Sequence, residues 1–159
     1  MTTGAGTGED TPISLVVDTN VWLDMLVFQD PGTCRLALLL HPSSPVSALS
    51  SEAMRAELAD VITRPQFKLG KAEQAGLLAR FDGIVTFTPA ALDCRLPCRD
   101  PDDRKFLDLA IDRRTTWLLS RDRALLAARK LAWRRFEVRI GQVPDFYTWL
   151  DATSRGASG

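Results

Sequence analysis

Short apolar strand segments alternate with longer helical segments along this chain, and that alternation restricts its fold more than any other feature. Ile13 to Val17 is a β-branched apolar run, which suits a strand buried on both faces. Other short strand candidates lie at 46–49, 84–87, 116–119 and 136–140. Helical patterns separate them at 21–28, 33–40, 50–63, 71–81, 102–113, 123–130 and 144–150. This order predicts an α/β fold with one parallel sheet covered by helices on both faces.

The size of the chain fits one domain. It has 159 residues, of which 45% are hydrophobic and 25% charged, close to the averages for proteins with a packed core. We expect this domain over 12–150, with disordered tails at 1–11 and 151–159, because both ends are rich in small polar residues. Neither a signal-peptide pattern nor an apolar run of membrane-spanning length occurs, so we expect no membrane contact.

The cysteine, histidine and charge content excludes several classes of protein. Three cysteines and one histidine provide neither a disulfide framework nor a zinc-ligand set, so we expect reduced thiols and a cytoplasmic location. The 20 basic and 20 acidic side chains give no net charge. Any affinity for a polyanion must therefore come from a local patch.

Two aspartates follow strand candidates. Asp18 comes directly after the strand at 13–17, and Asp122 follows the strand at 116–119 by a few residues. Ligand sites in parallel sheets lie beyond the carboxyl ends of the strands, so we expect both side chains at that edge. Ser120 could hold a carboxylate or a metal-bound water there. Each aspartate could instead only cap the next helix, an interaction that contributes about 1 kcal/mol.

Glu57 lies at the edge of an apolar helix face. Met54, Leu58 and Val61 form the apolar stripe of the helix at 50–63. A carboxylate turned toward a core is unfavourable without a partner, and no Lys or Arg lies one helical turn away. Glu57 therefore needs either a metal ion or an arginine partner from a distant part of the chain.

Asp103 lies in the middle of a helix face that Phe106, Leu107 and Ala110 should bury. The acidic run at 100–103 is also a good helix start, in which proline follows a capping residue and the acids interact with the helix dipole. That alternative does not explain why Asp103 faces inward.

Together these four acids predict a cation site. Two carboxylates about 4 Å apart repel each other by roughly 4 kcal/mol at an effective dielectric constant of about 20, so their convergence requires a bound cation. Oxygen ligands favour Mg²⁺ or Mn²⁺ over zinc or copper. A hard metal in an acidic pocket suits phosphodiester hydrolysis.

Four segments of the sequence resemble the PIN-domain superfamily, and more narrowly the toxin components of toxin–antitoxin systems, relatives of the VapC toxins. They are VVDTNVWLDML, SSEAMRAELADVITRPQF, CRDPDDRKFLDLA and LLSRDRALL, in that order. The resemblance implies a three-layer α/β/α PIN-like fold with a central parallel sheet of about five strands. It implies a Mg²⁺- or Mn²⁺-dependent endoribonuclease that hydrolyses RNA, the toxin of a type II toxin–antitoxin system. It also implies a homodimer and an antitoxin protein as partner.

The resemblance assigns catalysis and metal binding to an acidic quartet: Asp18, Glu57, Asp103 and Asp122. Asn20 and Ser120 fall where supporting polar residues often lie in this family. One position departs from the family pattern, because Arg104 stands where Asn is common. The acids are intact, but the arginine could change the charge at the mouth of the pocket.

Basic residues late in the chain are candidates for RNA binding. Arg121 and Arg123 flank Asp122, so we expect them to contact phosphates. A longer basic stretch surrounds Trp133 and comprises Arg129, Lys130, Arg134, Arg135 and Arg139. Such a stretch can hold a phosphate backbone and stack a base, but it is also compatible with a solvated helix face and a core tryptophan.

Two other functions fit parts of the pattern. A non-catalytic PIN-fold module that binds RNA or protein would keep the fold without turnover. A phosphatase of the haloacid dehalogenase type also begins with a strand that ends in Asp. It needs a second acid two residues later, where this chain has Asn20.

Overall fold

The computed structural model describes residues 12–41 and 43–158. The expected N-terminal tail at 1–11 therefore lies outside the described residues. Within them, five strands form one parallel sheet in the order β3-β2-β1-β4-β5, which confirms the predicted fold class. The strands are β1 (Ile13–Val17), β2 (Val46–Ser50), β3 (Val85–Phe87), β4 (Trp117–Leu119) and β5 (Arg139–Gly141).

Helices connect successive strands, as parallel pairing requires. The α-helices are α1 (Thr19–Leu26), α2 (Cys34–Leu39), α3 (Glu52–Val61), α4 (Lys71–Ile84), α5 (Arg104–Asp112), α6 (Arg123–Leu126), α7 (Arg129–Phe136) and α8 (Val143–Ser158). Three short 3₁₀ helices are η2 (Pro31–Thr33), η3 (Pro65–Phe67) and η4 (Pro101–Asp103). No helix in the described residues has an apolar stretch long enough to cross a bilayer.

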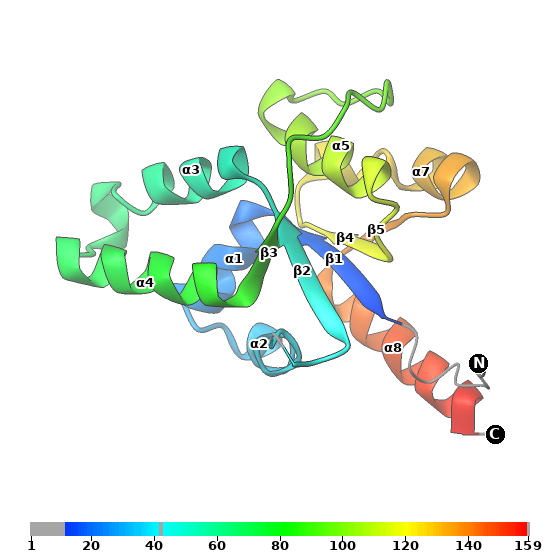
Figure 1. The fold of residues 1–159 in the computed structure, drawn as a ribbon, viewed down its shortest axis with the longest axis horizontal. Helices are drawn as coiled ribbons and strands as arrows, with labels where there is room; N and C mark the ends of the chain where they lie inside the picture. The colour runs from blue at the N-terminus through cyan, green and yellow to red at the C-terminus, as the bar shows by residue number, and fades with distance from the viewer. Residues whose placement is uncertain (1–11, 42, 159) are drawn as a thin grey trace.

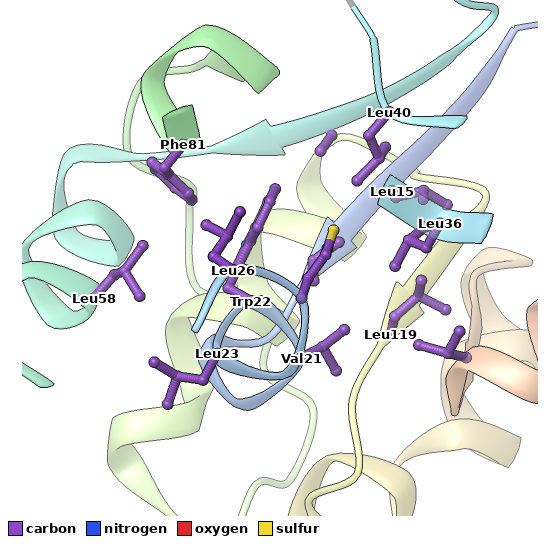
Figure 2. Packing of buried hydrophobic residues seen from close by; sticks show 14 of the residues in the cluster. Leu15, Val21, Trp22, Leu23, Leu26, Leu36, Leu40, Leu58, Phe81 and Leu119 are labelled. Atoms are coloured by element: carbon purple, nitrogen blue, oxygen red, sulfur yellow. The ribbon is translucent and has the colours of Figure 1, made fainter. Parts of the chain in front are cut away.

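Two hydrophobic cores cover the two faces of the sheet. Alternate residues of β1 point to opposite faces, so Leu15 packs in the core formed with α1, α2, α3, α4 and α8. Val16 packs in the other core, with α5, α6 and α7. Figure 1 shows α5 and α7 on one side of the sheet and α2 and α8 on the other. In Figure 2, Trp22 of α1 lies near Phe81 of α4, and their ring centroids are 4.8 Å apart.

The register of the central strands positions the acidic edge. Val17 at the end of β1 pairs with Leu119 at the end of β4. The backbone N–H of Asp18 then donates to the carbonyl of Leu119, at 2.9 Å. Residues that follow β1 and β4 are therefore held side by side where both strands end.

The region after β4 differs from the sequence prediction. The helix expected at 123–130 is two helices, α6 and α7, and the strand begins at Arg139 rather than at 136. Helix α7 buries Ala132 and ends with Glu137 in the left-handed conformation, at φ 58°. Glycine is the residue that most often adopts this conformation at the end of a helix. Because Glu137 stands there instead, no glycine marks the end of α7 in the sequence.

The C-terminal helix is longer than the prediction that ended it at 150. Residues 151–158, expected to form a disordered tail, continue α8 to Ser158. One reason is an ion pair, since the Arg35 guanidinium of α2 donates to both carboxylate oxygens of Asp151. This contact holds the first residue of the expected tail against α2.

Candidate metal centre

Asp18 is the most buried acid of the quartet. It follows β1 directly and its side chain is 3% exposed. Its backbone takes the N-cap position of α1, but its side chain makes no capping hydrogen bond to that helix. Burial raises the pKa of the Asp18 carboxyl, and the nearby charges of Glu57 and Asp122 add to this effect. A hydrogen bond from Ser120 and the backbone N–H of Thr19 act in the opposite direction.

Ser120 joins the ends of β1 and β4. Its hydroxyl is fully buried and donates to Asp18 Oδ2 at 2.7 Å. Ser120 Oγ also accepts the backbone N–H of Asp122 at 2.9 Å. Asp122 in turn caps α6, because its Oδ1 accepts the N–H of Ala124 at 2.7 Å. Asp122 is therefore a helix cap and a neighbour of Asp18 at once.

Asp103 has the least satisfied carboxylate of the quartet among the described residues. Its Oδ2 is buried and has no hydrogen-bond partner among the described residues. The pKa of Asp103 is raised to about 7, first by burial and then by a carboxyl–carboxyl hydrogen bond with Asp122 that requires a proton. The charges of Asp122, Asp18 and Asp100 raise it further. Asp103 therefore binds a proton more readily than an ordinary aspartate.

Glu57 is the one acid of the quartet with a basic partner in the described structure. Lys105 Nζ lies 2.6 Å from Glu57 Oε1, and the two side chains are 26% and 28% exposed. The Thr19 hydroxyl donates to the other carboxylate oxygen, Oε2. Glu57 thus has the distant basic partner that its sequence position left open, although this partner is a lysine.

Thr19 and Lys105 are contacts that sequence analysis missed. Thr19 is buried and lies between two residues that were considered, Asp18 and Asn20. Its position in the first turn of a helix that follows a strand was the signal that could have identified Thr19 as a site residue. Lys105 is 48 residues from Glu57, and no local pattern joins them.

Other predicted residues lie around the quartet with different partners. Asn20 is exposed, and its side chain makes no hydrogen bond within the described structure. Arg121 donates to both carboxylate oxygens of Asp24, at 2.9 and 3.0 Å, so an RNA phosphate would compete with that carboxylate. Arg123 is exposed and forms no ion pair with any described residue. Arg104 turns away from the quartet, to the carbonyl of Leu96.

A second group of donor atoms lies between α5 and the segment that precedes it. Asp93, Cys94 and Asp108 each offer an atom within 4.8 Å of the other two. Arg104 already pairs with Asp93 and lies 3.6 Å from Asp108. Burial, followed by the hydrogen bond with Asp108, raises the pKa of the Cys94 thiol to about 11. A protonated thiol and a guanidinium oppose metal binding, so we assign no metal to this group.

The donor chemistry of the quartet fits a divalent cation. No three of its carboxylates offer oxygens within 4.8 Å of one another in the described residues, although Asp103 and Asp122 share a hydrogen bond. Burial first, and neighbouring acids after it, raise the pKa values of Asp18 and Asp103, and one Asp103 oxygen has no hydrogen-bond partner among the described residues. Oxygen donors of this kind are those that hard divalent ions prefer.

Comparisons with known proteins give one family and one fold. The family profile described as PIN domain matches residues 14–124, a segment that contains the whole acidic quartet. The fold is similar to a chain in the crystal structure of VapBC2 from Rickettsia felis bound to a DNA fragment from their promoter. The TM-score is 0.56 and the identity 13%, over 80% of this chain and 97% of that chain. No curated protein matches the sequence.

Proposed function

Because this chain belongs to the PIN-domain family, we propose that it is a Mg²⁺- or Mn²⁺-dependent endoribonuclease that hydrolyses RNA phosphodiester bonds. The observation that carries the proposal is the buried Asp103 oxygen, which has no partner among the described residues, on a carboxyl group whose pKa the charges of Asp122 and Asp18 raise. A site built only to cap helices would not leave such an oxygen buried.

The residues of the quartet take different roles in this proposal. Asp18, Asp103 and Asp122 hold the divalent ion, and Ser120 fixes the orientation of the Asp18 carboxylate through its hydrogen bond. Glu57, held by Thr19 and Lys105, binds the ion or orients the attacking water. A divalent ion in such a site supplies neutralisation of the phosphate and activation of water.

Cleavage by an Asp18→Asn variant tests the proposal. We expect wild type to cut RNA when Mn²⁺ or Mg²⁺ is present and the variant to lose detectable cleavage, since a ligand charge is gone. Asp112→Asn is the matched control, because Asp112 is an exposed acid at the end of α5 outside the quartet. RNA fragments are compared on gels after circular dichroism has shown that all three chains fold. Full activity in Asp18→Asn would end the metal-site assignment.

The biological role in this proposal is that of a cytoplasmic toxin neutralised by an antitoxin, with a homodimer as the active form. Family membership and the likeness of the fold to a chain of a VapBC2 structure support it. Expression of wild type in a bacterial host should arrest growth, whereas Asp18→Asn should not. Normal growth with abundant, folded wild-type protein would contradict the toxin role. The nuclease assignment would then be tested by the gel assay alone.

The Lys105–Glu57 ion pair favours one alternative, a non-catalytic PIN-fold module that binds RNA or protein. In that case the ammonium group replaces the metal ion beside Glu57. Titration with Mn²⁺ discriminates between the two functions. A nuclease site should raise the midpoint of thermal unfolding with metal concentration, whereas a non-catalytic site should show little change.

A further inference from the structure

A strip of surface along α6, α7 and β5 gathers basic side chains beside the candidate metal centre. Two hollows lie along this basic strip. The first, of about 390 Å³, is lined by Arg123, Leu126, Ala127, Arg129 and Lys130. The second, of about 540 Å³, shares Arg129 and Lys130 with the first. Since Arg123 directly follows Asp122, the strip begins next to the acidic quartet.

The far end of the strip is aromatic. The Arg139 guanidinium lies over the Trp133 ring at 4.4 Å and over the Trp149 ring at 5.2 Å, and all three residues line the second hollow. Trp133 is 45% exposed, so it is not the core residue that the sequence left as an alternative. The guanidinium thus contacts two rings, and its N–H groups have no carboxylate partner among the described residues.

The charge of the strip is strongly positive, although the whole chain has no net charge. Four cations lie along it: Arg123, Arg129, Lys130 and Arg139. None of them forms an ion pair with a described residue. Asp145 is the one acid that lines the second hollow, and its carboxylate accepts the backbone N–H of Gln142 at 2.9 Å. The strip therefore offers several unpaired cations to a polyanion.

We propose that single-stranded RNA leaving the acidic quartet runs along this basic strip, with its phosphates on the four cations and a base stacked on Trp133. The choice of RNA rests on the proposed nuclease function. A peptide of Asp and Glu alone would satisfy the cations but brings no ring to stack on the exposed indole, whereas a nucleotide supplies both groups. The strand must be single because bases stacked in a duplex cannot reach a protein ring. The aromatic end lies beyond the segment 14–124 that matches the PIN-domain profile.

Binding of a fluorescein-labelled oligouridine of about 12 nucleotides, followed by anisotropy, tests this path. All variants are made in the full-length Asp18→Asn chain, so that the probe stays intact. Trp133→Ala should weaken binding at least about fivefold without changing its salt dependence, and Trp133→Tyr should restore most of the affinity. Lys130→Ala should lower the slope of log Kd against log salt by about 0.7, the value for one phosphate contact on a single strand.

Arg135→Ala is the matched control, because Arg135 is an exposed cation of α7 that lines neither hollow. It should leave affinity and salt slope unchanged. If Trp133→Ala fails to fold, the Lys130→Ala slope still decides the question. The path is overturned if both variants bind like the parent chain. It is also overturned if a polyglutamate peptide binds as tightly with the same dependence on Trp133, or if Trp133→Ala alters only the oligomeric state in sedimentation.

Failure of the nuclease function is a separate result. If the wild-type chain cuts no RNA with Mn²⁺ or Mg²⁺ while the variants change binding as expected, the strip is an RNA site and the proposed catalysis is wrong. If wild type cuts RNA and the Trp133 and Lys130 variants bind normally, only the path along the strip is wrong.

Discussion

Asp18 and Asp103 hold their carboxylates in surroundings that oppose ionisation. Burial is the first cause of the raised pKa in both residues, and neighbouring acids add to it. Hydrogen bonds from Ser120 and the Thr19 backbone limit the effect at Asp18, while one oxygen of Asp103 has no such partner in the described part of the chain. In the absence of a metal ion, ionised acids at this edge therefore reduce the stability of the folded chain.

Asp18→Asn should consequently stabilise the metal-free protein. The amide oxygen can still accept the Ser120 hydroxyl, whereas the buried charge and its repulsion from Glu57 and Asp122 are lost. We expect a gain of about 1 kcal/mol, which raises the unfolding midpoint by about 2–4 °C for a chain of this size. Calorimetry at neutral pH in EDTA measures this unfolding midpoint for both chains. A lower midpoint than wild type would mean that the carboxylate stabilises the fold.

Lys105 takes the place of a cation beside Glu57, so Lys105→Gln should have opposite effects with and without metal. In EDTA we expect a loss of about 0.5–1 kcal/mol, because the ion pair is about one quarter exposed. With saturating Mn²⁺ we expect the metal-dependent rise in melting temperature to exceed that of wild type. Lys71→Gln, at the first residue of α4, is the control. An unchanged response to Mn²⁺ would show that the lysine and the metal do not compete.

At the scale of elements, the attachment of α8 depends on Tyr147. Its hydroxyl accepts the N–H of Leu36 at 2.9 Å and donates to the carbonyl of Gly32 at 2.7 Å. Arg35, which pairs with Asp151, also lies over the Tyr147 ring at 5.0 Å. These contacts join the C-terminal helix to η2 and α2, and they explain why α8 continues beyond its predicted end.

Tyr147→Phe should destabilise the chain by about 1–2 kcal/mol, because it leaves two backbone groups without their partner. The pH dependence tests the cause. Burial is the main reason that the pKa of Tyr147 is raised above its ordinary value near 10. Wild type therefore has this stability in full below about pH 10 and loses it as pH rises through the raised pKa. The difference in unfolding free energy between the two chains should shrink above that pH, and a constant difference would contradict the assignment.

At the scale of the whole molecule, the two hydrophobic cores share one sheet. Leu15 of β1 belongs to the core with α1, α2 and α8, and Leu118 of β4 belongs to the core with α5, α6 and α7. Both side chains are 0% exposed, and their strands pair directly. Loss of packing on either face therefore weakens the same central strands.

Leu15→Ala and Leu118→Ala should each lower the free energy of unfolding by about 2–5 kcal/mol, as cavities in packed cores do. Each variant should still unfold in one transition, with tryptophan fluorescence and far-ultraviolet circular dichroism giving the same denaturant midpoint. Two separated midpoints in either variant would show that the two layers fold independently.

Local patterns in the sequence were sufficient for much of this structure. Strand β1 was predicted at its observed bounds because a β-branched apolar run is a local signal. The acids after β1 and β4 were placed at one edge because parallel strands end together. The bounds of α6, α7 and α8 were not predicted, since they depend on a left-handed residue without glycine and on an ion pair between α8 and α2.

The sequence alone determined the parallel α/β architecture and the placement of Asp18 and Ser120. Both follow from the alternation of strand and helix segments along the chain and from hydrophobic periodicity, which are properties of neighbouring residues. Tertiary structure decided which partners the charged groups have. Lys105 meets Glu57 across 48 residues, and Arg121 meets Asp24 across 97. The stacking of Arg139 on Trp133 and Trp149 also appeared only in the folded chain. Long side chains reach several neighbours equally well, so only the packing of whole elements selects their contacts.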